Sequence, residues 1–410
     1  MNRLAKIGIV SLSVVIFSYV GLGHVLGQTS DDKTYRSLTV FGEVLQKVQQ
    51  DYVDEPNVRM VTAGSLHGLL ESLDPQSSYL TPREYAEYKQ KLANPGTGET
   101  GVTLSKRLGY ILVVSVLPES PAQKAGLHAG DILESVAGFT TRDMSVGQAL
   151  NLLAGAPGTG VKVSAIRGRA EPQPIDLVRE KLAPPKIVSQ KVDPDILVLR
   201  LPSLDRGRAE EVRERLMQAV KQGVHKVVLD VRDCGRGDVA EAVGIAQLFL
   251  SSGTVSNLSG QTVSRQITYA DPAKVVWKGP LSLLINTSTS GAAEVLASAM
   301  VSRRRGDVVG ERTFGLASEQ KLIPLEDGSA IFLTVANYMN ADEKPILEEG
   351  VTPTEVVRAS ASPDENDTDE DSSGAGNSKV APVEPRPLSP EDPVLRKAIE
   401  LLKAPAKKAA

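Results

Sequence analysis

The sequence predicts a multi-domain α+β protein, because its patterning changes twice along the chain. Residues 33–98 place apolar side chains such as Leu38 and Phe41 at helical spacing. Residues 99–182 contain short apolar runs of strand length between glycine-containing turns. Residues 183–358 alternate strand-like and helix-like segments, which is typical of an α/β layered domain. We therefore expect three folded regions of different class.

Length and composition exclude several classes of protein. A chain of 410 residues with 41% hydrophobic residues can form two or three domains with cores of their own. A net charge of −4 gives no reason to expect a nucleic-acid partner. The single cysteine, Cys234, excludes an internal disulfide, and the scattered histidines form no set with metal-ligand spacing. We expect neither a metal nor a cofactor.

The first 30 residues predict export from the cytoplasm. Arg3 and Lys6 precede an apolar stretch over residues 7–26, which is about the length needed to cross a bilayer. The following segment lacks a clean small-x-small cleavage site, which favours a retained membrane anchor over a cleaved signal peptide. In either case we expect the rest of the chain, after residue 30, to work in the periplasm or cell envelope.

Further segments complete the expected organisation. The sequence TPRE at residues 81–84 predicts a capped helix start with proline at the first helical position. Residues 359–393 are acidic and rich in Ser, Asp and Pro, which predicts a disordered linker, and residues 394–404 predict a last amphipathic helix. The α/β region should contain helices over residues 207–221, 238–251 and 290–303, and strands at DILVLRLP, HKVVLDVR, PLSLLIN, DVVG, LIPL and SAIFLTVANY.

Residues 99–182 resemble a PDZ domain. The resemblance is carried by ESPAQKAGLHAGDILESVAG at residues 119–138, where a short helix, a glycine turn and a returning strand follow one another. In that family a loop offers backbone N–H groups to a peptide's terminal carboxylate, and the peptide adds as a strand beside a helix. The matching residues are the loop Gly101, Val102, Thr103 and Leu104, and Val146 and Leu150 on the helix. The resemblance implies binding of protein or peptide C-termini; otherwise these residues are only core.

The order of segments resembles the carboxyl-terminal processing peptidases, peptidase family S41. An export segment, a helical region with SLDPQSSYLTPREY, one PDZ module, VVLDVRDCGRGD and GERTFG follow one another. The resemblance implies a β-barrel-like PDZ domain and an α/β core of the ClpP/crotonase type over residues 183–358. It also implies proteolysis by a serine nucleophile, whose proton goes to a lysine whose pKa burial has lowered.

The two residues that the family uses for catalysis are replaced here. Counted from Glu294, the nucleophile position falls on Gly291, and counted from the TFG segment, the lysine position falls on Leu316. The two positions are 25 residues apart, as in the family, so no insertion or deletion hides the missing residues. The resemblance implies that Gln320 would orient the lysine, and this residue is kept.

The turn that the resemblance assigns to the oxyanion hole is altered as well. It reads Cys234, Gly235, Arg236 and Gly237, with Arg236 at the first glycine position of the family's turn. A backbone N–H could still point into the site, but an arginine side chain must now be accommodated beside it.

A relocated nucleophile is the alternative to a disabled site. Ser290 and Ser288 neighbour Gly291, and Lys321 is the nearest lysine. Lys321 lies five residues beyond Leu316, so in an extended segment its side chain points to the opposite face. Ser290 would point about 100° away from a nucleophile one residue on. We expect these serines and the adjacent threonines to cap the helix that begins near Gly291.

Three functional hypotheses follow. The first is a pseudo-peptidase that captures exposed C-termini as an adaptor or regulator, attached to the membrane by its N-terminal segment. The second is an active serine endopeptidase that uses a relocated serine such as Ser290. The third is a scaffold that self-associates through its helical regions. A homo-oligomer or an active relative of the same family is the expected protein partner in the first and third cases.

Overall fold

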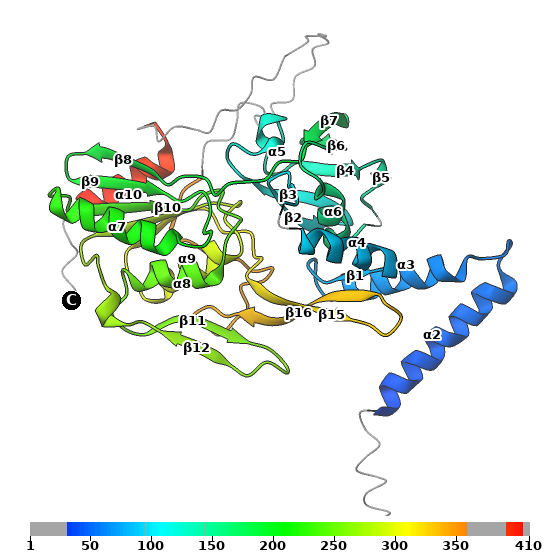
Figure 1. Ribbon diagram of the computed structural model, residues 1–410. Coiled ribbons are helices and arrows are strands. Elements are labelled where there is room, and N and C mark those ends of the chain that lie inside the picture. Colours follow the sequence, from blue (N-terminus) through cyan, green and yellow to red (C-terminus); the bar gives the residue numbers. More distant parts are fainter. Residues whose placement is uncertain (1–30, 95, 143, 359–390, 405–410) are drawn as a thin grey trace, which may run out of the picture. The chain divides into compact units, whose positions relative to one another are not determined.

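The computed structural model describes residues 31–94, 96–142, 144–358 and 391–404 (Figure 1). Its contacts divide the chain into two compact units, and the boundary in the sequence lies between Ser65 and Leu66. The expected targeting segment, including residues 7–26, and most of the expected linker lie outside the described residues. Among the helices that are described, none is long and apolar enough to span a membrane.

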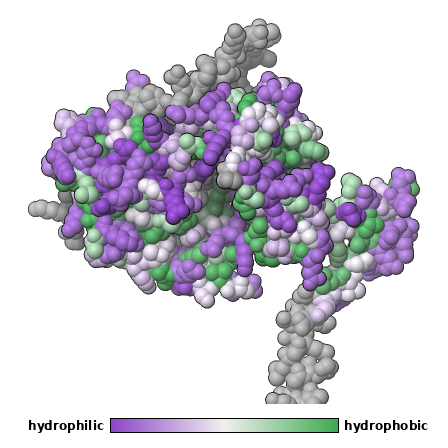
Figure 2. Space-filling model, in the orientation of Figure 1, coloured by the Kyte–Doolittle hydropathy of each residue, from purple (hydrophilic) through white to green (hydrophobic). Residues whose placement is uncertain are grey.

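The first unit consists of α2 (Asp31–Asp51) and the first part of α3 (Val58–Glu71). The apolar residues that predicted α2 stay exposed: Leu38 is 60% and Phe41 46% accessible. Figure 2 shows hydrophobic residues along one side of this helix. The helix therefore presents an apolar stripe to solvent.

The expected helical region 33–98 also contains a strand, which corrects that prediction. Strand β1 (Ser78–Leu80) precedes α4 (Pro82–Ala93), whose predicted capping box is confirmed by the reciprocal hydrogen bonds of Thr81 and Glu84. Residues 78–80 are extended because they pair antiparallel with the distant strand β16 (Ala330–Tyr338). A pairing partner some 250 residues away in the sequence cannot be read from local periodicity.

The second region folds as one small sheet around a core of its own. Its strands lie in the order β2-β3-β4-β6-β7, with β5 beside β4. The elements are β2 (Val102–Arg107), β3 (Tyr110–Val116), α5 (Pro121–Lys124), β4 (Ile132–Val136), β5 (Phe139–Thr140), α6 (Val146–Leu153), β6 (Gly160–Ile166) and β7 (Gln173–Val178). Helix α6 begins after Ser145, whose hydroxyl accepts a hydrogen bond from the backbone N–H of Gln148. This helix runs beside β2, with which it packs.

The third region is built on a six-stranded sheet of order β17-β14-β13-β10-β9-β8. All neighbouring pairs are parallel except β8 with β9. Its strands are β8 (Val188–Asp193), β9 (Ile196–Arg200), β10 (Lys226–Asp230), β13 (Leu281–Ile285), β14 (Asp307–Gly310) and β17 (Glu355–Val356). The predicted strands at β9, β10, β13 and β14 are confirmed, whereas β8 and β17 were not predicted.

Helices cover both faces of this sheet (Figure 1). One face packs against α7 (Arg208–Lys221), α8 (Val239–Gln247) and α9 (Ala292–Ser302). The other face packs against α10 (Pro393–Lys403), the predicted last helix. Alternate residues of β9 divide between the two cores, with Leu197 in the first and Ile196 in the second. Continuous apolar strands are what a parallel sheet buried on both faces requires.

Strand β1 belongs to a further sheet, in which it pairs with β16. This sheet also contains β11 (Thr254–Ser259), β12 (Gln266–Tyr269) and β15 (Ser318–Pro324), with the short 3-10 helix η1 (Pro272–Lys274) after β12. The predicted strands LIPL and SAIFLTVANY form the antiparallel β15–β16 hairpin, and β15 begins earlier than expected. The hairpin follows the TFG segment directly and therefore positions residues 316–320.

Candidate active site

Gly291 occupies a sharp turn between the buried strand β13 and helix α9. Its backbone has φ +61° and ψ −121°, a conformation that L-residues with a side chain rarely adopt. A Cβ built at Gly291 meets no atom within 4 Å, so the position is strained for other residues but not crowded. Hydrolases use a sharp strand-to-helix turn of this kind to expose a nucleophilic side chain. The turn is therefore present, and the side chain is missing.

The Thr289 hydroxyl stabilises the turn before Gly291 rather than the helix. It donates to the carbonyl of Val231 at 2.9 Å and accepts from the backbone N–H of Asn286 at 3.0 Å. The N-cap of α9 is Gly291 itself, which has no side chain to cap the helix, and its N–H donates to the Glu294 carboxylate. The expectation that the serines and threonines cap this helix is therefore wrong. Thr289 instead attaches the turn to Val231, which follows β10.

The buried carboxylate of Glu294 connects the two former catalytic segments. One of its oxygens accepts from the backbone N–H groups of Gly291 at 2.8 Å and Leu316 at 2.7 Å. The other accepts from the Thr313 hydroxyl and the Gly315 N–H, both at 2.6 Å. Burial raises the pKa of Glu294, and these hydrogen bonds act in the opposite direction. The positions of nucleophile and base are thus held to one another through a single side chain.

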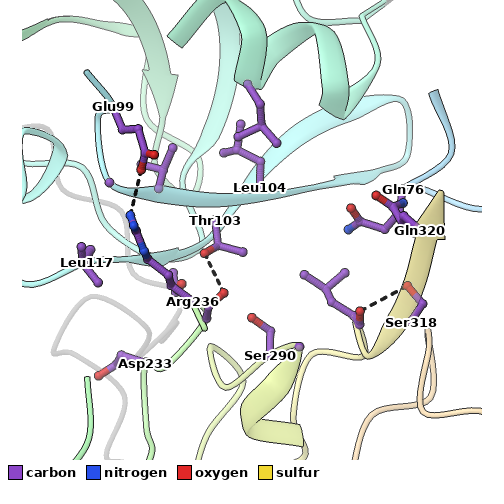
Figure 3. A pocket seen from close by; sticks show the side chains of 17 residues that line it. Gln76, Glu99, Thr103, Leu104, Leu117, Asp233, Arg236, Ser290, Ser318 and Gln320 are labelled. Carbon is purple, nitrogen blue, oxygen red and sulfur yellow. Dashed lines mark hydrogen bonds and ion pairs between the residues drawn. The ribbon is translucent and has the colours of Figure 1, made fainter. Parts of the chain in front are cut away.

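A cavity of 410 Å³ brings most of the predicted site residues together (Figure 3). It is lined by Ser290, Gly291, Leu316, Gln320 and Arg236, together with Gln76, Glu99, Gly101, Val102, Thr103, Leu104, Ser115, Leu117, Leu150, Asp233, Gly235 and Ser318. Two of the predicted residues, Gly237 and Val146, do not line it. The lining residues come from segments that lie far apart in the sequence, and the fold brings these segments together at the cavity.

Ser290 faces this cavity without a group to activate it. Its side chain is 1% exposed, and its hydroxyl has no hydrogen-bond partner among the described residues. None of the lining side chains belongs to a lysine or histidine. Leu316, Ser318 and Gln320 line the cavity alternately, whereas Lys321 does not line it. This agrees with the prediction that Lys321 lies on the opposite face of the extended segment.

The side chain of Arg236 turns toward two carboxylates, of which Figure 3 shows that of Glu99. Its guanidinium pairs with Glu99 at 2.8 Å and with Asp205 at 3.1 Å. The backbone carbonyl of Arg236 accepts a hydrogen bond from the N–H of Leu204 at 2.8 Å. The arginine is accommodated as a link between the α/β core and the start of the second region.

The start of β2 lies directly against the turn that contains Arg236. The Thr103 hydroxyl donates to the carbonyl of Gly235 at 3.1 Å. A Cβ built at Gly235 would lie 2.1 Å from the hydroxyl oxygen of Ser115, so a larger residue would require that side chain to move. The threonine that replaces the second glycine of the PDZ loop thus contacts the altered oxyanion turn.

A second cavity of 600 Å³ lies between α4, α6 and the segment that leads into β2, at the start of the groove that the resemblance assigns to a peptide. Gly101, Val102, Val146 and Leu150 line it. Of the predicted groove residues, Val146 and Leu104 are each only 3% exposed and contribute mainly to the core, whereas Leu150 is 42% exposed. The two cavities share Gly101, Val102 and Leu150 among their lining residues, so they adjoin one another.

Comparison with known proteins agrees with this geometry. The family profile of peptidase family S41 matches residues 195–357, and that of the PDZ domain matches residues 112–167. The chain is 26% identical over 347 residues to the carboxy-terminal processing protease CtpA of Bacillus subtilis, covering 84% of this chain and 74% of that protein. It is 28% identical to the carboxy-terminal-processing protease of Bartonella bacilliformis, covering 83% and 79%.

A solved structure shares the fold. The photosystem II D1 C-terminal processing protease superposes with a TM-score of 0.65 at 25% identity, over 78% of this chain and 92% of that one. Over residues 195–357 the chain is similar to peptidase family S41. Its S41 core and PDZ domain are those that the order of segments predicted. Within the described residues, no group of His, Cys, Asp and Glu side chains could hold a metal ion.

Sequence reasoning missed the part that Glu294 plays in this S41 site. Glu294 served to locate Gly291, but nothing predicted that its carboxylate would bind both segments. A glutamate at the third position of a helix that begins after a buried strand is a usable signal, because such a residue often accepts from the N-cap. Gln76, Ser115 and Leu117 were also missed, since they come from other elements that only the fold brings to the cavity.

Proposed function

We propose that this chain is a catalytically silent S41 homologue that binds protein C-termini through its PDZ domain and serves as an adaptor or regulator. One observation carries the proposal: Gly291 and Leu316 occupy the positions of nucleophile and base in one cavity. Gly291 has no atom that could attack a peptide carbonyl, and Leu316 has none that could accept a proton. The chemistry is absent although the turn that would present it is formed.

The retained scaffold supports binding as the remaining activity. Glu294 holds both segments with four hydrogen bonds, although neither segment carries a reacting group. Gln320 still lines the first cavity, and the second cavity adjoins it. A site that had no use would not need a buried carboxylate, whose desolvation is costly. Continued binding of polypeptide in this cleft accounts for its preservation.

A protease assay with restored residues tests the proposal. The native protein, Gly291→Ser, Leu316→Lys and the double variant would be incubated with an unstructured protein such as β-casein. We expect cleavage only by the double variant, because nucleophile and base are both required. Cleavage by the native protein at the rate of the double variant would refute a silent site. The single variants are the matched controls.

Arg236 gives this assay a necessary extension. If the double variant is inert, Arg236→Gly would be added to restore the glycine of the oxyanion turn. Activity of the triple variant would show that the turn was the remaining obstacle. A triple variant that folds but does not cleave would show that the scaffold has lost more than these residues, while the silent native site would stand.

A second candidate function is proteolysis with Ser290 as nucleophile. The buried, unpartnered hydroxyl of Ser290 at the cavity favours it, although no base lies beside that hydroxyl. A serine-directed fluorophosphonate would label the native protein and fail to label Ser290→Ala if this candidate were correct. Absence of labelling in the native protein removes it.

We also propose that the protein works outside the cytoplasm, attached to a membrane by residues 7–26. The two basic residues before the apolar stretch support this orientation. Alkaline phosphatase fused after residue 30 would be active in a bacterial host only if the segment directs export. Fractionation of the full-length chain then separates a retained anchor, found with membranes, from a cleaved signal.

A further inference from the structure

The loss of the catalytic residues leaves empty space at the former reaction centre. A Cβ at Gly291 would meet nothing within 4 Å, so the space in front of this turn is open. The cavity there has a volume of 410 Å³. This volume is far more than the roughly 30 Å³ that one water occupies, and it lies within the range of about 300–1,000 Å³ that is usual for ligand pockets.

The walls of this space combine aliphatic side chains with polar ones. Leu316 stands where the family has a lysine, and the other aliphatic lining residues come from the PDZ side: Val102, Leu104, Leu117 and Leu150. Each charged lining residue has an ion-pair partner, because Arg236 pairs with Glu99 and Asp233 pairs with Arg200. A leucine in place of an ammonium removes a further charge that would disfavour an apolar guest. The aliphatic part of the wall can therefore hold an aliphatic side chain.

One polar group in the pocket lacks a partner. The Ser290 hydroxyl is buried, has no hydrogen-bond partner among the described residues and points toward Thr103 (Figure 3). A buried hydroxyl is normally paired, so rotation of the Ser290 side chain toward the cavity would let this hydroxyl pair with a ligand's polar group. A peptide carbonyl or N–H can pair with a hydroxyl, which both donates and accepts.

The pocket continues into the second cavity, at the start of the expected peptide groove. The two cavities share Gln76, Glu99, Gly101, Val102, Leu150 and Gln320 as lining residues. A polypeptide bound beside β2 can thus extend to Gly291 without leaving the cleft. An extended chain advances about 3.3 Å per residue, so a few residues are enough to connect the two cavities.

We propose that the former reaction centre is a side-chain pocket that holds an aliphatic residue of the bound C-terminal peptide, with the Ser290 hydroxyl paired to the peptide backbone. This inference rests on the proposed function, since it requires that the cleft binds peptides without cutting them. It adds a second specificity position, upstream of the terminal residue, which this chain gained when Gly291 and Leu316 replaced the catalytic pair.

The test uses the full chain and a defined set of peptides. The probes are fluorescein-labelled Gly-Ser decapeptides that end in valine with a free carboxylate, with a single leucine placed at each other position in turn. Fluorescence anisotropy gives the Kd of each peptide. We expect leucine at one or two neighbouring positions to tighten binding at least about tenfold over the parent peptide.

Two variants and one matched control locate the effect. Leu316→Lys should remove the gain from leucine, measured as the ratio of the Kd values of parent and leucine peptides within that variant, and Ser290→Ala should weaken both peptides alike. Leu325→Lys makes the same chemical change in the turn of the same hairpin, away from the cavity, and should keep the gain. A photoreactive leucine at the favoured position should crosslink the unmodified protein to residues of the pocket, such as Leu316 or Leu104.

The outcomes distinguish this inference from the function on which it rests. One outcome would overturn the pocket and keep the proposed function. In it, the parent peptide binds, C-terminal amidation abolishes that binding, and leucine tightens binding at no position. A gain that survives Leu316→Lys, together with crosslinks confined to α6, would also overturn it. Failure of every peptide to bind would remove both. A gain lost in Leu316→Lys but kept in Leu325→Lys supports the pocket.

Discussion

Replacing Glu294 with glutamine tests whether one carboxylate holds the silent site together. The substitution keeps the size of the side chain and changes one oxygen into an amide nitrogen. All four groups that contact the carboxylate are donors, from Gly291, Thr313, Gly315 and Leu316. Each oxygen accepts two of them. If the amide nitrogen lies on the Thr313 side, the rotatable Thr313 hydroxyl can accept from it, and only the Gly315 N–H loses its acceptor. In the other orientation the N–H groups of Gly291 and Leu316 both lose their acceptor.

The expected cost follows from these contacts. A hydrogen bond to a charged group contributes about 1.5–3 kcal/mol, and one or two are lost outright, which gives about 1.5–6 kcal/mol. This range includes the roughly 3–5 kcal/mol found when one partner is removed from a buried charged network. For a domain of this size such a loss lowers Tm by about 10 °C.

Chemical denaturation followed by circular dichroism measures this change in the free energy of unfolding. Glu326→Gln is the matched control, because Glu326 is exposed in the β15–β16 turn and should change stability by less than about 0.5 kcal/mol. A Glu294→Gln protein within about 1 kcal/mol of the control would refute the reasoning. It would mean that the donors find other acceptors and that the two segments do not depend on the carboxylate.

Three further predictions concern the surroundings of the site. Burial raises the pKa of Cys234 to about 12, so a disulfide reagent should leave the native protein unlabelled at about pH 8 and label it once guanidinium chloride unfolds it. Burial acts to raise the pKa of Asp230, but the adjacent Arg232 guanidinium outweighs it and lowers the pKa overall. Stability from this pair is therefore present above about pH 4 and lost as the pH falls through the folded pKa, and Asp230→Asn should flatten the acid side of the stability profile. Glu99→Gln removes the ion pair to Arg236, which keeps its pair with Asp205, and Glu99 is half exposed. Stability should therefore fall by no more than about 1 kcal/mol while amide hydrogen exchange in residues 99–104 becomes faster. Unchanged exchange there would mean that the ion pair does not restrain the loop.

Local pattern was sufficient for most elements of the S41 core. Strands such as β10 and β13 are continuous apolar runs bounded by turns, and the helices between them show their own periodicity. Residues 78–80 were assigned to a helical region because their partner in β16 is remote in the sequence. The short strands β11 and β12 were missed because they are half exposed and carry few apolar residues.

That Gly291 and Leu316 carry neither a nucleophile nor a base was determined by the sequence alone, because no fold can add an atom that a side chain lacks. The resemblance to the processing peptidases implies that their positions are those of the catalytic pair. The strained turn, the cavity in front of it and the role of Glu294 were decided only by the tertiary structure. They depend on contacts between segments that lie far apart along the chain, such as that between Thr103 and Gly235. Such contacts arise from how two sheets and a PDZ domain pack, and local periodicity carries no record of that packing.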